Sequence, residues 1–254
     1  MLISTSWNGR LLVPADDLSV MPELVFTGAL ELPLTSFIIN EVKHGQTVVD
    51  MGANVGYFTV LLGLLVGPTG KVVAYEANPD IIPYLNDSLS INYMHDRTTV
   101  IPKAVYSCDT VITFYANAKY KGNASIQKHT DVYFQHYKED VVPVSVETEA
   151  LDRYAGLFPT IDLLKIDIEG GEYHAFLGMK SFLDGRRIGT IVFELNGTAL
   201  QDDEAPFFDL LRSYRDNVGY TFHLIDREGR LVPVSLEELA AAPGYPYVVM
   251  KPKP

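Results

Sequence analysis

The sequence predicts an α/β protein built on a doubly wound, mostly parallel β-sheet, with helices on both faces and an antiparallel pair of strands at the C-terminal edge. Between residues 47 and 215, short apolar strands alternate with segments whose apolar positions recur at helical spacing. Such alternation is typical of parallel sheets with crossover helices. Two late strands that lie close together in sequence predict the antiparallel pair. The first core strand leads into VVDMGANVGYF (48–58), in which two glycines follow an aspartate.

The first 44 residues are predicted to form an extension that precedes the core. WNGRLLVP (7–14) places an Asn-Gly turn between short apolar runs, which is a hairpin signal. LPLTSFIINEV (32–42) carries apolar residues at helical spacing. Neither an internal repeat nor a linker rich in proline and serine interrupts residues 1–254, so we expect a single domain whose core is 45–254.

The core elements are predicted in chain order from their apolar patterns. The predicted strands are TVVDM (47–51), KVVAYE (71–76), TTVIPKAV (98–105), TVITFYA (110–116), VVPVSVET (141–148), DLLKIDI (162–168) and TIVFEL (190–195). The predicted helices are 57–66, 79–92, 149–156, 172–183 and 204–215. Residues 219–234 fit a strand, a turn and a returning strand, and 245–251 fit one more strand.

Composition limits the classes of partner. The formal charge of −12 argues against nucleic acid, because phosphate binding needs a basic surface. The longest apolar stretch, at 60–67, is too short to span a bilayer, and the N-terminal segment lacks the pattern of a signal peptide. The one cysteine, Cys108, excludes an internal disulfide. We expect a cytoplasmic protein that acts on a small molecule and does not bind membranes. Assembly into a homo-oligomer is compatible with the sequence.

The glycine-containing loop predicts a site for an adenosine-containing cofactor. A glycine directly after a buried strand allows a tight turn and the close approach of a ligand, as Gly52 does here. The following helix offers free N–H groups and a positive dipole end. Glu76, at the end of the second core strand, can accept hydrogen bonds from ribose hydroxyls. NAD and S-adenosylmethionine both fit these features, and a tight turn without a ligand is the alternative.

The glycine spacing separates these cofactors. A pyrophosphate needs G-x-G-x-x-G, whereas three residues stand between Gly52 and Gly56. Asn54 can hydrogen-bond the amino-acid end of a methionine group, and Asp50 can face its ammonium directly or through water. The spacing therefore favours S-adenosylmethionine.

Three motifs together resemble the FkbM family of S-adenosylmethionine-dependent methyltransferases. They are VVDMGANVGYF, YEANP (75–79) and LLKIDIEGGEYHAFLG (163–178), and the resemblance covers about residues 45–200. It implies the seven-stranded, Rossmann-like fold of class I methyltransferases and O-methylation of sugars, polyketides or other small molecules. The predicted cofactor contacts are Asp50, Gly52, Ala53, Asn54, Gly56, Tyr57, Glu76, Ala77, Val105 and Asp167.

The adenine contact departs from the wider methyltransferase pattern. After the third strand an acidic residue often meets the adenine amine, but here the stretch is AVYSCD (104–109). Val105, Tyr106 or the side chain of Asp109 can serve instead.

Asp167 is the first candidate for a general base that activates an acceptor hydroxyl. Strand alternation places Lys165, Asp167 and Glu169 on one side of an otherwise apolar strand. Buried charges are costly unless they are paired or functional. Asp167 lies at a strand end beside the glycine loop, which favours a functional role; the alternative is a Lys165–Asp167 ion pair that supports the sheet.

Three further residues have alternative readings. Glu169 can act as a base or can cap the helix that begins near Glu172. Glu194, at the end of TIVFEL, can bind the substrate or make structural hydrogen bonds. His174 is a candidate catalytic base, because a histidine side chain titrates near neutral pH. The alternative is a solvent-facing histidine, since His174 does not lie on the apolar side of its predicted helix. Because no pair of acids and no carboxylate–histidine cluster has clear ligand spacing, we predict no metal site.

The passage 114–140 is a candidate substrate loop, because it is rich in aromatic and polar residues and interrupts the α/β pattern. Its candidate substrate contacts are Tyr120, Lys121, Asn123 and Ser125, to which Glu194 is added. A surface loop held by aromatic packing is the alternative.

The sequence leaves other functions open. Peptide or carboxylate acceptors fit almost as well as a small-molecule hydroxyl. A nicotinamide-dependent oxidoreductase and a non-catalytic cofactor-binding protein share the fold, but G-x-G-x-x-G and Tyr-x-x-x-Lys are missing from the sequence.

Overall fold

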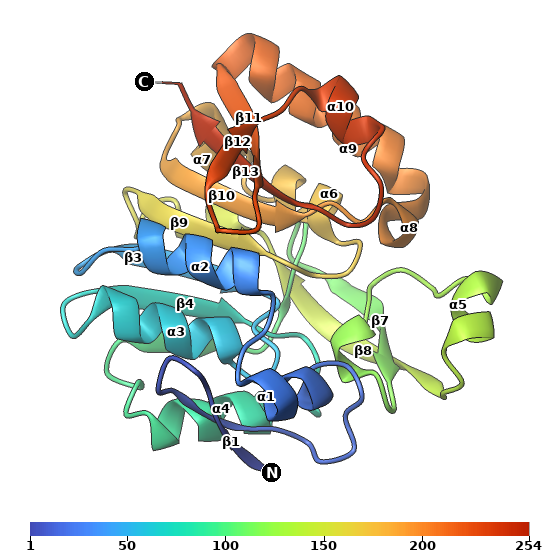
Figure 1. The fold of residues 1–254 in the computed structure, drawn as a ribbon. Helices are drawn as coiled ribbons and strands as arrows, with labels where there is room; N and C mark the ends of the chain where they lie inside the picture. Colours follow the sequence, from blue (N-terminus) through green and yellow to red (C-terminus); the bar gives the residue numbers. More distant parts are fainter. Residues whose placement is uncertain (254) are drawn as a thin grey trace.

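The computed structural model describes residues 1–253 and is built around one eight-stranded sheet (Figure 1). In spatial order its strands are β12 (Leu231–Pro233), β11 (Tyr220–Ile225), β13 (Tyr247–Pro252), β10 (Ile188–Glu194), β9 (Ile161–Ile166), β3 (Thr47–Met51), β4 (Lys71–Tyr75) and β5 (Thr98–Ile101). Strands β10, β9, β3, β4 and β5 are parallel, whereas β13, β11 and β12 pair in antiparallel fashion. The predicted doubly wound, mostly parallel sheet with antiparallel C-terminal strands is confirmed, and β12 adds an eighth strand.

Helices cover both faces of this sheet because neighbouring strand residues point to opposite sides. Val48 packs with one face, and Val49 packs with the other. The first face is covered by α1 (Met21–Thr27), α2 (Leu32–Glu41), α3 (Tyr57–Val66) and α4 (Ile82–Ile91). The second is covered by α6 (Glu172–Leu177), α7 (Lys180–Asp184), α9 (Glu204–Ser213) and α10 (Leu236–Ala240). Between β10 and α9 lie α8 (Gly197–Leu200) and the short η3 (Gln201–Asp203), and the π-helical η4 (Tyr214–Val218) follows α9.

The N-terminal residues form a small hairpin that packs on the first face. Its strands are β1 (Leu2–Ser4) and β2 (Arg10–Leu12), with Asn8 at φ 67° in the turn. The hairpin is wider than the predicted 7–14 because the turn spans more residues. Trp7 Nε1 donates to the hydroxyl of Tyr57 at 3.0 Å, which joins this extension to α3.

The predicted substrate loop is the tip of a second, three-stranded sheet. Its strands are β6 (Ala104–Val105), β8 (Val141–Glu149) and β7 (Val111–Asn117), and its tip carries η1 (Lys121–Asn123) and α5 (Asp131–His136). The predicted strand 110–116 corresponds to β7, so the start of the passage 114–140 is regular and the tip follows it. Pro102 separates β5 from β6 within the predicted strand 98–105, because proline cannot donate to a strand ladder.

Two predicted helices are shorter than expected. The helix predicted over 172–183 is divided into α6 and α7 at Gly178, where a Cβ would lie 2.0 Å from the carbonyl oxygen of Tyr106. The helix predicted over 149–156 is the 3-10 turn η2 (Leu151–Tyr154). Gly178 thus lets the backbone of Tyr106, which follows β6, approach the end of α6, and the periodicity of the sequence carries no sign of that contact.

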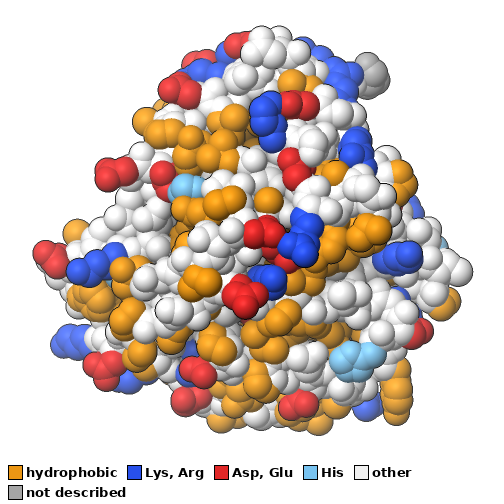
Figure 2. Space-filling model, turned by 180° about the vertical axis from the view of Figure 1, so that it is seen from behind, with side chains coloured by type: hydrophobic (Ala, Val, Ile, Leu, Met, Phe, Trp, Pro, Cys, Tyr) orange, Lys and Arg blue, Asp and Glu red, His pale blue; other side chains and the backbone are white. Residues whose placement is uncertain are grey.

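The surface mixes charges with apolar side chains. On the face drawn in Figure 2, basic side chains stand among acidic and hydrophobic ones. In residues 1–253, no helix alone has the length and apolarity to cross a membrane; α1 and α2 reach that threshold only together, with a bend of 74° between them.

Candidate functional site

Three adjoining pockets open at the carboxyl ends of β3, β4, β9 and β10. The glycine-loop pocket is lined chiefly by Gly52, Asn54, Glu76, Ala77, Ile81, Lys103, Val105, Phe114, Lys121, Gly122, Ile126, Asp167 and Glu169. The acidic pocket is lined chiefly by Ser19, Glu23, Glu31, Gly52, Ala53, Asn54, Tyr57, Gly122, Asn123, Lys165, Asp167, Glu169, Glu194 and Tyr247. The aromatic pocket is lined chiefly by Asn123, Ser125, Gln127, His129, Tyr133, Tyr137, Glu169, Glu194, Asn196 and Tyr245. Glu169 lines all three, and Asp167 lines the first two.

Gly52 allows the ends of β3 and β9 to approach closely. Its φ is 80°, and a Cβ there would lie 1.8 Å from the carbonyl oxygen of Asp167. Both features exclude side chains, so this turn brings the glycine loop directly against the strand end that carries Asp167.

Replacing Gly52 by alanine is therefore expected to cost about 1–3 kcal/mol more than the same change at Gly244, because extra atoms must be forced into a packed contact. Gly244 has a similar φ of 76°, but nothing lies within 4 Å of its virtual Cβ. Denaturant unfolding of both variants measures the difference. Equal losses would show that the left-handed backbone alone, and not the contact with Asp167, requires the glycine.

Two of the predicted cofactor contacts lie behind the pockets. Gly56 begins α3 with φ 94°, and its virtual Cβ would meet Leu85 of α4 at 2.8 Å, so the glycine serves helix packing. Asp50 is fully buried beneath the loop, where it accepts a hydrogen bond from Thr59 Oγ1 at 2.6 Å. We expected both to contact a ligand, and the structure gives them supporting roles.

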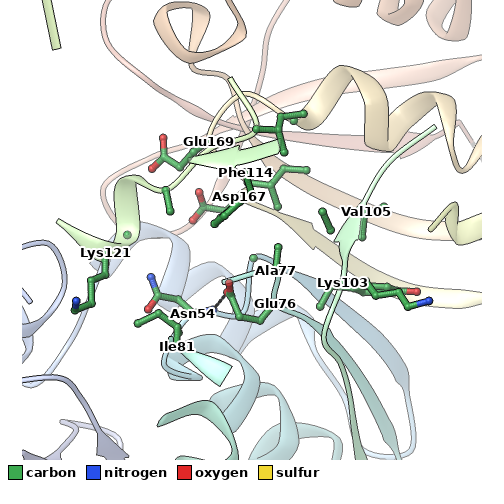
Figure 3. A pocket seen from close by; sticks show the side chains of 18 residues that line it. Asn54, Glu76, Ala77, Ile81, Lys103, Val105, Phe114, Lys121, Asp167 and Glu169 are labelled. Atoms are coloured by element: carbon green, nitrogen blue, oxygen red, sulfur yellow. Dashed lines mark hydrogen bonds between the residues drawn. The ribbon is translucent and has the colours of Figure 1, made fainter. Parts of the chain in front are cut away.

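Glu76 combines a loop-forming role with a position on the pocket wall. Its carboxylate accepts hydrogen bonds from the backbone N–H groups of Asn54 and Asn78, each at 2.7 Å. Burial raises the pKa of Glu76, although these amide donors act in the opposite direction. In Figure 3 its carboxylate stands beside Asn54, with Asp167 and Glu169 on the other side of the pocket. Its remaining lone pairs are placed to accept from a ligand.

Four residues that line the pockets have a left-handed backbone without being glycine. The φ of Asn54 is 49°, that of Glu31 is 45°, and those of Glu169 and Gln201 are both 51°. Such conformations cost energy and persist where the surrounding structure holds them, often at functional sites. Here the Asn54 backbone is held by Glu76, and the carbonyl of Glu169 accepts from Ser125 Oγ at 2.5 Å.

Lys165 is a buried cation between two carboxylates. Its Nζ lies 3.3 Å from Asp50 Oδ1 and 3.5 Å from Asp167 Oδ2, and the residue is 1% exposed. Burial alone would lower the pKa of Lys165, but the two carboxylates outweigh it and raise that pKa. The ion pair considered from the sequence is therefore present, yet Asp167 also lines two pockets and accepts from the Tyr247 hydroxyl at 3.1 Å.

Three carboxylates converge where the pockets meet. One oxygen from each of Asp167, Glu169 and Glu194 lies within 4.8 Å of the others. Burial, reinforced by the neighbouring carboxylates, raises the pKa of Glu194 to about 9 and that of Glu169 well above its usual value. Glu31, from the N-terminal extension, joins this group, and burial raises its pKa to about 7. Hard cations prefer such oxygen ligands. The spacing of these acidic residues along the chain does not reveal that they converge.

Glu172, and not Glu169, stabilises the turn before α6. Its carboxylate accepts from the N–H groups of Ile168 at 3.2 Å and Gly170 at 3.0 Å. The capping alternative for Glu169 is therefore wrong. Complete burial raises the pKa of Glu172 to about 7.

This shift predicts how stability depends on pH. The folded state holds the Glu172 proton more tightly than the unfolded chain does, so the contribution is full below about pH 4.5 and is lost as the pH rises to about 7. The loss corresponds to about 3 kcal/mol. Glu172→Gln should flatten this part of the curve, which unfolding at pH 5 and pH 7.5 measures. Equal slopes in parent and variant would contradict the assignment.

His174, in α6, does not line any of the three pockets. Its ring stacks on Tyr106 with centroids 4.2 Å apart, and its Nε2 lies 3.3 Å from Asp203 Oδ2. Burial lowers the pKa of His174 in spite of Asp203. The prediction that His174 is a catalytic base is not supported by this position.

The tip of the second sheet reaches the pockets as expected, with one exception. Lys121 lines the glycine-loop pocket, Asn123 lines the acidic and aromatic pockets, and Ser125 lines the aromatic pocket. Tyr120 instead packs edge-on against Tyr137, with ring centroids 4.7 Å apart.

Sequence reasoning missed residues contributed by distant segments. Phe114 and Ile126 give the glycine-loop pocket an apolar wall, and alternation in β7 was the available signal for Phe114. Glu31 from the extension and Tyr247 from β13 line the acidic pocket, and neither carries a local motif.

A family model covers most of the chain, whereas the similar solved structures share little sequence identity with it. The family model described as "Methyltransferase FkbM domain" matches residues 50–222. A search of curated proteins finds no match to the sequence. Similar solved structures include a SAM-dependent O-methyltransferase from Thermotoga maritima, with 16% identity, a TM-score of 0.46, and coverage of 100% of this chain and 78% of that one.

Two further structures are similar at the same level. The O-methyltransferase from Bacillus cereus in complex with SAH has 16% identity, a TM-score of 0.46, and coverage of 93% of this chain and 82% of that one. Precorrin-6y C5,15-methyltransferase from Geobacter metallireducens has 13% identity, a TM-score of 0.46, and coverage of 89% and 92%. The family match spans most of the chain and contains the glycine loop, Glu76 and Asp167. The chain therefore belongs to the FkbM methyltransferase family and is an S-adenosylmethionine-dependent methyltransferase.

Proposed function

We propose that this methyltransferase transfers a methyl group from S-adenosylmethionine to a hydroxyl of a small molecule, such as a sugar or a polyketide. The adenosine part of the cofactor occupies the glycine-loop pocket, and its methionine end extends into the acidic pocket. The acceptor occupies the aromatic pocket. The observation that carries the proposal is that Asp167 and Glu169 stand where these pockets meet.

The shapes and polarities of the pockets support this arrangement. Val105, Phe114 and Ile126 form an apolar wall suited to a base, and Glu76 faces them with free acceptor capacity for a ribose. The aromatic pocket combines Tyr133 and other rings with amide side chains such as Asn196, which suits an acceptor with an apolar face and hydroxyls.

Methyl transfer to a hydroxyl needs positioning and a base. Holding donor and acceptor in line supplies about 7–11 kcal/mol, and a general base adds about 10²–10⁴-fold. Asp167 is the proposed base, because its carboxylate lines both proposed cofactor pockets and is oriented by Lys165 Nζ at 3.5 Å and by the Tyr247 hydroxyl at 3.1 Å. Burial raises the pKa of Glu194 to about 9 and also raises the pKa of Glu169, which favours a role for both as hydrogen-bond donors to the acceptor.

The charge of Asp167 disfavours a carboxylate acceptor. A negatively charged group in the aromatic pocket would approach the Asp167 carboxylate, which lies within 4.8 Å of Glu169 and Glu194 on the wall of that pocket, so its entry would raise the electrostatic energy of the site. Neutral hydroxyl acceptors avoid this repulsion.

A panel of acceptors tests the proposal. The protein is incubated with S-adenosylmethionine and sugars, phenols, polyketide alcohols, carboxylic acids or peptides, and mass spectrometry detects the gain of one methyl. Mild alkali then separates products, because methyl esters hydrolyse and methyl ethers do not. Alkali-stable products from hydroxyl acceptors support the proposal, and products that are exclusively esters contradict it.

Replacing Glu76 by alanine tests the cofactor site. Loss of a charged hydrogen-bonding partner costs about 1.5–3 kcal/mol, so binding of S-adenosylhomocysteine should weaken about ten- to a hundredfold by calorimetric titration. Glu76→Gln retains one acceptor oxygen and should lose less. An alanine variant that binds as tightly as the parent would remove Glu76 from the cofactor site.

A further inference from the structure

Asp17 is a fully buried carboxylate whose bonds join two distant parts of the chain. Its Oδ1 accepts from Ser19 Oγ at 2.6 Å and from the N–H of Lys121 at 3.1 Å. Its Oδ2 accepts from the N–H groups of Val20 at 2.9 Å and Met21 at 3.1 Å. A buried carboxylate needs such donors to offset its lost hydration. The bonds to Val20 and Met21 support the start of α1, whereas the bond to Lys121 connects Asp17 to the tip of the second sheet.

Two more contacts strengthen this junction. The N–H of Leu18 donates to the carbonyl of Lys119 at 2.7 Å, and the N–H of Gly122 donates to Ser19 Oγ at 2.8 Å. A Cβ on Gly122 would lie 2.9 Å from Ser19 Oγ and 3.5 Å from Asn54 Nδ2. Gly122 is thus held between the N-terminal extension and the glycine loop.

The junction closes the proposed cofactor site on one side. Lys121 and Gly122 line the glycine-loop pocket, and Ser19 and Gly122 line the acidic pocket. Figure 3 shows Lys121 at the edge of the first pocket, across from Val105 and Lys103. A cofactor that spans both pockets lies under residues 119–122, which we call the strap. The demethylated cofactor, S-adenosylhomocysteine, must leave after each turnover.

We propose that Asp17 is a positioning residue that fastens residues 119–122 over the methyl donor, and that this strap opens when the cofactor exchanges. The inference rests on the proposed cofactor site. Segments that close over substrates commonly control product release. Here the segment is held by a small set of hydrogen bonds to residues 17–19, and Asp17 itself does not line the pockets.

Kinetics of S-adenosylhomocysteine release test the role of Asp17. We expect Asp17→Asn to raise the dissociation rate about tenfold or more, and Ser19→Ala to raise it a few-fold, because each weakens the strap. Ser235→Ala is the matched control, since it removes a helix-capping hydroxyl from α10, far from the pockets. A variant Asp17→Asn that melts at a lower temperature but releases S-adenosylhomocysteine at the parental rate overturns the proposal.

A covalent lock provides an independent test. In a Cys108→Ser background, the pair Ser19→Cys and Gly122→Cys can form a disulfide once the two Cβ atoms move apart by a few tenths of an ångström, because a Cβ on Gly122 lies 3.1 Å from Ser19 Cβ and the usual spacing is about 3.5–4.5 Å. The oxidised protein, loaded with S-adenosylhomocysteine beforehand, should retain it, and a thiol reductant should restore release. Equal release from oxidised and reduced protein overturns the strap. Failure of the unlocked parent to bind S-adenosylhomocysteine would instead refute the cofactor site itself.

Discussion

Asp167→Asn is expected to lower the rate of methyl transfer by about 10²-fold or more, because the amide keeps the shape of the carboxylate but cannot accept the acceptor's proton. Stability should change little, since Lys165 retains Asp50 as a counter-ion at 3.3 Å. Affinity for S-adenosylhomocysteine should also stay near the parental value. Single-turnover rate, cofactor affinity and melting temperature, measured on one preparation, separate these effects.

Glu169→Gln is the matched comparison for Asp167→Asn. Burial raises the pKa of Glu169, which favours a hydrogen-bond donor role that the glutamine amide can also fill, so the rate should fall less. If Glu169→Gln loses more activity than Asp167→Asn, the base is Glu169. If the Asp167 variant is folded, binds cofactor and turns over fully, Asp167 has no part in the chemistry.

Lys165→Met is expected to cause the largest loss of stability, about 3–5 kcal/mol, because it leaves the buried Asp50 without its counter-ion. Asp50 is 0% exposed, and Thr59 Oγ1 would remain as a neutral partner. Denaturant unfolding measures the loss. The double variant Lys165→Met/Asp50→Asn should regain part of it, since the uncompensated charge is removed as well. Additive losses in the double variant would show that the two residues are not coupled.

The sequence predicts those parts of the fold that depend on local pattern. The strand Thr47–Met51 and the helix Tyr57–Val66 have the predicted ends, because apolar runs and flanking glycines determine both. The neighbourhood of Gly52 and Asp167 was also predicted, since parallel strands bring their carboxyl ends to one edge. Those residues directly follow Met51 and Ile166, which pair at the ends of two adjacent parallel strands.

Other parts of the site depend on tertiary contacts that no local pattern contains. Glu31 reaches the acidic pocket from an extension that was predicted only to precede the core. The left-handed turn at Glu169 carries its carboxylate towards Glu194, beyond what strand alternation describes. The stacked position of His174 could not be predicted from helix periodicity, because its partner Tyr106 follows strand β6 of the second sheet.

The second sheet has a consequence for how enzymes of this architecture diversify. Phe114, Ala116 and Val146 give it a small core of its own, apart from the two cores of the main sheet. Residues 127–138 supply His129, Tyr133 and Tyr137 to the aromatic pocket and contribute no residue to the glycine-loop pocket. Under the proposed function, we expect a different stretch grafted between these borders to change the choice of acceptor while the cofactor pockets stay the same.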